Sequence, residues 1–134
     1  MKAVKWSADL LIGIEDIDQE HQGLIACLGD LVAACDADES AEVQGKLLEQ
    51  LRQRTREHFV HEEDEMSKLG YPEFEAHQAI HGELISELDD IVEAFADTGS
   101  QGLSAETLQY LEDWLSQHIV MEDRKIGKFV GVAD

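Results

Sequence analysis

Five of the six histidines in this chain fall at positions from which they could converge on one site. They occupy four separate segments: His21; His58 with Glu62; His77 with His81; and His118 followed by Glu122 and Asp123. Imidazoles and carboxylates are ligands that suit iron, manganese or zinc. Together these groups exceed what a single ion needs, so the pattern predicts a two-metal centre inside a helical bundle.

The spacing of these residues is a weak signal on its own, because the chain is rich in glutamate. A histidine followed four residues later by glutamate occurs three times, at His58, His61 and His118. Such a pair shares one helix face, which lets both side chains grip one ion. Location is the stronger argument, since each of the five histidines falls in the middle of an apolar helix face. An unpaired polar group there costs roughly 2–7 kcal/mol. One such histidine is more often a hydrogen-bonded core residue, but metal coordination is the more economical interpretation of five.

Two positions need separate treatment. His61 lies about 100° from the centre of its helix's apolar sector, so we place it outside the metal shell. Of the two acids after His118, α-helical geometry favours Glu122. Asp123, five residues on, would need a widened turn of the π type. Spacing alone leaves both acids open.

Apolar residues recur with helical periodicity in four segments that follow an extended arm at about 1–15. Gly70 is suited to end the second helix and Ser104 to cap the fourth. The pattern predicts one all-α domain over 1–134, an up-down-up-down four-helix bundle. The expected helices are about 16–35, 40–69, 73–97 and 104–125.

The chain is strongly acidic, with 10 Lys and Arg against 30 Asp and Glu and a formal net charge of −20. Such a surface repels nucleic acids and anionic membranes, so we expect neither as a partner. No apolar run reaches the length of a membrane span, and the first residues do not form a signal peptide. We therefore expect a cytoplasmic protein in which Cys27 and Cys35 are reduced. No protein partner follows from the sequence, and we expect a monomer.

A set of short motifs follows one another in a fixed order. These are Ile17-Asp18-Gln19-Glu20-His21; His58-Phe59, then Glu62-Glu63 and Met66; Tyr71-Pro72; His77 and His81; and Trp114-Leu115 before His118-Ile119 and Asp123. In this order and spacing they resemble the hemerythrin family in its single-domain bacterial form, from Trp6 to about Asp123. The chain departs from that pattern at Glu20, where the family often has glutamine, and at His61, an additional histidine.

The resemblance implies a centre of two non-haem iron ions joined by an oxo or hydroxo bridge. One iron would be fully coordinated and would be bound by His77, His81 and His118. The other would be bound by His21 and His58 and would keep one position open. Both irons would be bridged by Glu62 and Asp123. It therefore selects Asp123, where helical spacing favours Glu122. It also implies an apolar lining for the O2 pocket, formed by Phe59, Trp114, Leu115 and Ile119.

The function implied is reversible O2 binding, for carriage, storage or supply, rather than enzymatic turnover. An imidazole-rich site favours this reading, because oxidative ferritin-like centres are rich in glutamate. Two alternatives stay open. One is an O2 or redox sensor, and the other is a di-iron redox enzyme acting on peroxide or nitric oxide.

Overall fold

The computed structural model describes residues 13–98, 103–129 and 131. The extended arm expected at about 1–15, including Trp6, lies almost wholly outside the described residues. Within those residues the secondary structure is helical throughout.

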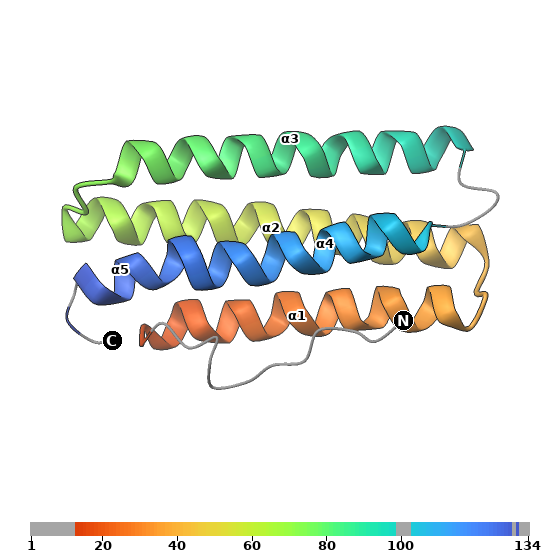
Figure 1. Cartoon of the computed structure of the whole chain (residues 1–134), viewed down its shortest axis with the longest axis horizontal. Coiled ribbons are helices and arrows are strands. Elements are labelled where there is room, and N and C mark those ends of the chain that lie inside the picture. Colours follow the sequence, from red (N-terminus) through yellow and green to blue (C-terminus); the bar gives the residue numbers. More distant parts are fainter. Residues whose placement is uncertain (1–12, 99–102, 130, 132–134) are drawn as a thin grey trace.

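Four long helical stretches lie side by side along the longest axis of the molecule (Figure 1). Consecutive stretches run in opposite directions, so the predicted all-α, up-down-up-down four-helix bundle is confirmed. The fourth stretch is interrupted by a π-helical segment and continues to Phe129, beyond the expected end near residue 125. The elements are α1 (Glu15–Asp36), α2 (Ala41–Leu69), α3 (Phe74–Thr98), α4 (Ala105–Gln117), the π-helix η3 (His118–Asp123) and α5 (Arg124–Phe129).

Side-chain and glycine caps fix several helix ends. The Ser40 hydroxyl accepts a hydrogen bond from the Val43 amide at 3.2 Å, and the Ser104 hydroxyl accepts one from the Thr107 amide at 3.1 Å. These caps satisfy amides that have no partner inside α2 and α4. Gly70 ends α2 in the left-handed region, with φ 66°. The caps predicted at Ser104 and Gly70 are thus confirmed.

The apolar core has a larger and a smaller cluster. The larger includes Leu51 of α2 and Leu115 of α4, whereas the smaller is built from Met66, Tyr71 and Ile126. Along α2 and along α4–α5, the histidines and carboxylates of interest fall between these two clusters. The fold therefore places them in the bundle interior, with apolar packing on both sides.

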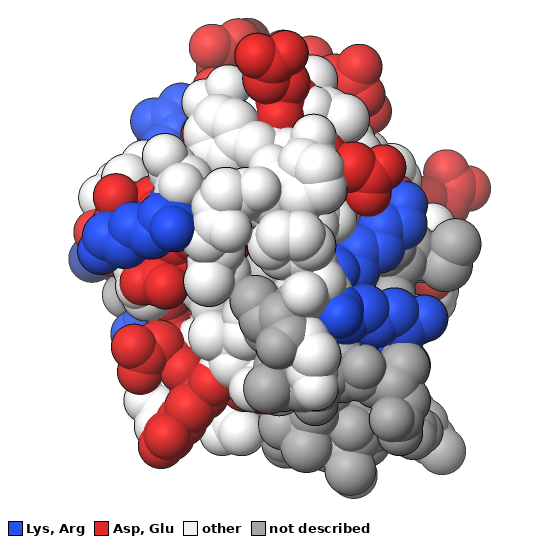
Figure 2. Space-filling model, turned by 90° about the vertical axis from the view of Figure 1, so that its left-hand side faces the viewer, with Lys and Arg blue, Asp and Glu red and all other residues white. Residues whose placement is uncertain are grey.

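The end of the bundle that carries the smaller cluster is shown in Figure 2. Uncharged side chains occupy its middle, and acidic and basic side chains surround them. Met66 and Ile126 are at most 1% exposed, so this end is closed over the interior. Among the described residues, no helix has the length and apolar content needed to cross a bilayer.

Candidate metal centre

Seven polar side chains from all four helical stretches meet in the bundle interior, and each is buried. α1 contributes one of them, α2 two, α3 two and η3 two. Their ligand atoms form two groups, each with its atoms within 4.8 Å of one another. The two groups are Glu62, His77, His81, His118 and Asp123, and His21, His58, Glu62 and Asp123. The structure thus brings together all seven residues that the sequence proposed as ligands.

The π-helix η3 explains why Asp123 belongs to the cluster. A π turn advances by about five residues, so side chains five apart return to one face. Asp123 accordingly lies 2.9 Å from His118, measured from Oδ1 to Nε2, and is fully buried. Glu122 lies outside the cluster, where its carboxylate is 3.5 Å from the Lys125 ammonium. The α-helical preference for Glu122 is therefore wrong, because the backbone here is not α-helical.

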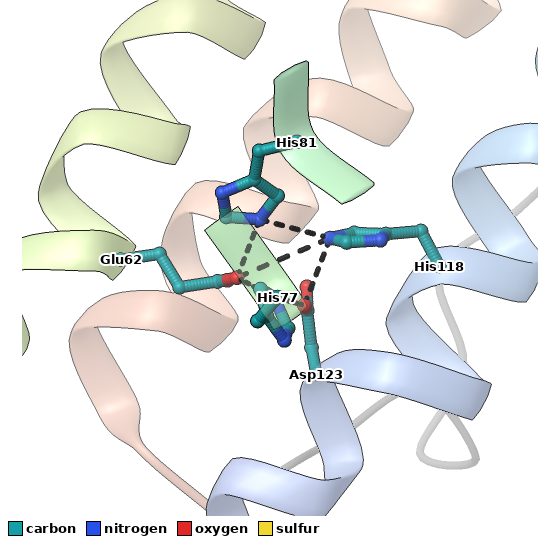
Figure 3. A group of neighbouring side chains, drawn as sticks. All are labelled: Glu62, His77, His81, His118 and Asp123. Carbon is teal, nitrogen blue, oxygen red and sulfur yellow. Dashed lines mark hydrogen bonds and ion pairs between the residues drawn. The ribbon is translucent and has the colours of Figure 1, made fainter. Parts of the chain in front are cut away.

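Each of the two carboxylates divides its oxygens between the two groups of histidines. Glu62 Oε1 lies 2.7 Å from His77 Nε2 and 3.0 Å from His81 Nε2 (Figure 3), while Oε2 lies 3.0 Å from His58 Nε2. This is the arrangement that a carboxylate bridging two ions requires.

Asp123 repeats the pattern from the opposite side of the bundle. Its Oδ1 lies 3.0 Å from His77 Nε2, and its Oδ2 lies 2.8 Å from His21 Nε2. Figure 3 shows Asp123 and Glu62 approaching the three-histidine group from different helices. Two ions placed in the two groups would therefore share both carboxylates.

Several buried polar atoms have no hydrogen-bond partner, although imidazoles lie close to them. They include Oε2 of Glu62 and both carboxylate oxygens of Asp123. In addition, Nε2 of His21 faces Nε2 of His58 at 3.0 Å, so the two nitrogens compete for one proton. Cations in the two groups would satisfy all of these atoms at once. The mixture of imidazole and carboxylate donors suits divalent iron, manganese or zinc.

Electrostatics show that the cluster favours positive charge. Burial opposes the charged form of His58, but hydrogen bonds to Glu20 and Glu62 outweigh it and raise its pKa to about 10. Burial likewise opposes protonation of His77, whose hydrogen bonds to Asp123 and Glu62 raise its pKa to about 9. Burial would raise the pKa of Glu62, yet the surrounding imidazoles hold it well below its usual value. The carboxylates therefore stay ionised, and positive charge in the cluster, on imidazolium groups or on bound cations, balances them.

Apolar and aromatic side chains lie against the histidines. Phe59 stacks on the His81 ring, with centroids 3.8 Å apart and planes 3° from parallel. Trp114 lies 6.3 Å from the Phe59 ring, and Leu115 is 2% exposed. The side chain of Ile119, the fourth residue expected in the pocket lining, lies outside the described part of the structure. All three described side chains are buried, and Phe59 also lies against His58 and His118.

Other contacts to the ligand histidines were not assigned from the sequence. Glu20 lies 2.6 Å from His58 and Glu63 lies 3.0 Å from His81, in both cases at Nδ1. Both contacts join different helices, so spacing along one helix gives no signal for them. His61 lies outside the cluster, as expected, but its Nδ1 is 2.7 Å from the other oxygen of Glu20.

Comparison with known proteins gives consistent similarities. The family model described as "Hemerythrin HHE cation binding domain" matches residues 12–130. A bacteriohemerythrin of Stenotrophomonas maltophilia is 32% identical over 124 residues, which cover 92% of this chain and 79% of the relative. A myohemerythrin of Theromyzon tessulatum is 26% identical, with 90% of this chain and 88% of the relative covered. The crystal structure of a wild-type hemerythrin superposes with a TM-score of 0.85 at 28% identity, covering 95% of this chain and 97% of that one.

Proposed function

Because the chain belongs to the hemerythrin family, we propose that it binds O2 reversibly at a non-haem di-iron centre in the bundle interior. The observation that carries this proposal is the division of the Glu62 and Asp123 oxygens between two groups of histidines. A site for one ion needs no such division.

In this proposal the two groups hold iron ions that differ in their number of side-chain ligands. The three-histidine group would hold one ion with five side chains, and a solvent-derived oxo or hydroxo bridge would complete its coordination. The two-histidine group would hold the other ion with four side chains, which would leave room for O2 beside the same bridge. Glu62 and Asp123 belong to both groups and would be shared by the two ions. When bound, two ferrous ions supply the two electrons on which reversible O2 binding draws.

The remaining side chains of the site exclude water. Phe59, Trp114 and Leu115 are at most 8% exposed, and the Phe59 ring lies against the rings of His58, His81 and His118. A dry, apolar surrounding strengthens the electrostatic grip of the ligands and suppresses side reactions with water. We propose a binding protein rather than an enzyme on the basis of the family membership and the imidazole-rich ligand set. A cytoplasmic location and a monomeric state belong to the same proposal.

An anaerobic optical titration tests the function directly. Protein that is reduced and loaded with two irons per chain should change its spectrum on addition of O2. The spectrum should return to the reduced form when argon removes the O2. Metal analysis before and after should give the same iron content. Irreversible oxidation at the first exposure would instead favour a redox enzyme.

A further inference from the structure

Two carboxylates outside the ligand set contact the far side of ligand imidazoles. Glu20 of α1 places Oε1 2.6 Å from Nδ1 of His58, and Glu63 of α2 places Oε2 3.0 Å from Nδ1 of His81. In both rings the opposite nitrogen, Nε2, points into the cluster. Each of the two histidines thus lies between Glu62 and a carboxylate outside the ligand set. We call Glu20 and Glu63 the outer carboxylates.

Each outer carboxylate is also held at its second oxygen. Glu20 Oε2 lies 2.7 Å from Nδ1 of His61, and Glu63 Oε1 accepts a hydrogen bond from the Gln78 side chain at 2.8 Å. These anchors fix the carboxylates in one orientation, although they are only partly buried.

The contacts divide the ligand set unequally. The Nδ1 atoms of His21 and His118 are buried without a hydrogen-bond partner. Each group of ligands therefore contains at least one imidazole that is backed by a carboxylate and one that is not. His58 belongs to the two-histidine group, which in the proposed function holds the iron with the open position.

We infer that Glu20 and Glu63 are positioning residues of the metal centre, and that Glu20 also lowers the reduction potential of the iron with the open position. The inference rests on the proposed function. A carboxylate that accepts the Nδ1 proton fixes the imidazole so that the Nε2 lone pair faces the metal, and it makes the imidazole a stronger donor. Because Glu20 is negatively charged and makes the shorter contact, it stabilises the ferric state and lowers the reduction potential of the pair. His61 serves it as an anchor.

Graded substitution at Glu20 separates these effects. Glu20→Ala removes the acceptor, so the affinity of the apoprotein for Co²⁺ should fall about 10–100-fold at one of the two sites. Glu20→Gln keeps a carbonyl acceptor but removes the charge, so it should retain most of that affinity. The midpoint potential of its reconstituted di-iron centre should still rise above that of the wild type.

Glu57 provides the matched control. It lines the same surface hollow as Glu20 and His58, a hollow of about 400 Å³, but it accepts a hydrogen bond from the Gln53 side chain instead. Glu57→Gln and Glu57→Ala remove the same charge from the same region without touching a ligand imidazole. Both should leave the Co²⁺ affinity and the midpoint potential close to wild type.

Thermal unfolding of the apoproteins separates positioning from simple helix contact. The inference is overturned if Glu20→Ala binds Co²⁺ as tightly as Glu57→Ala. It is also overturned if Glu20→Gln leaves the potential unchanged while the apoprotein melts lower, since Glu20 would then only join α1 to α2. None of these measurements uses O2. A wild type that loads two irons but does not release O2 contradicts the proposed function alone.

Discussion

Glu62 is the residue on which both halves of the cluster depend. It is 1% exposed, and its two oxygens serve different groups of histidines. Its position four residues after His58 puts both side chains on one face of α2. The same spacing between His61 and Glu65 leads to the surface, so the apolar face decides which pair belongs to the site. Two pairs of substitutions examine this at the residue scale.

His58 and His61 make the first pair. His58→Ala should reduce the metal content below two ions per chain, because it removes a proposed ligand and the imidazole that lies 3.0 Å from Glu62 Oε2. His61→Ala should keep two ions per chain, since His61 pairs with the carboxylates of Glu20 and Glu65, neither of which is a proposed ligand. Metal analysis after desalting measures both. Equal losses would show that the side of α2 assigned to the site is wrong.

Asp123 and Glu122 make the second pair. Asp123→Ala should lower the metal content below two ions per chain, because one of the two shared carboxylates disappears. Glu122→Ala should leave the metal content unchanged, because the Glu122 carboxylate pairs with the surface residue Lys125. Iron stoichiometry and the optical spectrum report the difference. If only the Glu122 variant lost metal, the π-helical arrangement of η3 would be contradicted.

At the scale of the helices, the sequence was sufficient where structure follows periodicity and capping. Apolar residues at helical spacing placed the long helices, and Ser104 and Gly70 marked ends that the structure confirms. Spacing failed at η3, because a π turn depends on the backbone hydrogen-bond pattern and leaves no trace in an α-helical projection. Resemblance, rather than geometry, selected Asp123.

Contacts between helices were also beyond the reach of periodicity. Glu20 meets His58 across α1 and α2, and Glu63 meets His81 across α2 and α3. Which outward-facing side chain reaches a neighbouring helix depends on how the helices are rotated against each other. A pattern along one helix does not contain that information.

Substitution of two glycines compares the effect of an added Cβ at a helix end with its effect inside a helix. Gly70→Ala should destabilise the protein by about 1 kcal/mol, because Gly70 adopts the left-handed region at φ 66°. Gly82→Ala should stabilise it by about 0.5–1 kcal/mol, since Gly82 lies inside α3 and an added Cβ meets nothing within 4 Å. Thermal melts of the two apoproteins should move in opposite directions. An unchanged or raised melting temperature for Gly70→Ala would contradict the capping role of Gly70.

At the scale of the molecule, the metal cluster lies between two apolar clusters inside a very acidic shell. The formal net charge of −20 favours the accumulation of cations near the surface. The larger apolar cluster contains Leu28, Leu51 and Leu111, which are not ligands and pack without any metal. The bundle should therefore form in the absence of iron, while its stability depends on whether the buried carboxylates are neutralised.

Removal of the metal tests this coupling. An ion present at 100 times its dissociation constant stabilises the folded state by about 2.7 kcal/mol if it does not bind the unfolded chain. Chelation should therefore lower the melting temperature, while the far-ultraviolet circular dichroism spectrum at about room temperature should remain that of a helical protein. Adding Fe²⁺ anaerobically should restore the melting temperature in a concentration-dependent way, with saturation at two ions per chain.

The His58→Ala variant is the control for that experiment, because it keeps the fold while lacking one proposed ligand. The melting temperature of the variant should rise less on addition of Fe²⁺ than that of the wild type. Calorimetry of wild type and variant, each with and without metal, gives the four values needed. If the wild type gained no stability from Fe²⁺, or saturated at one ion per chain, the divided oxygens of Glu62 and Asp123 would have to be explained by hydrogen bonding to imidazolium groups instead of by two cations.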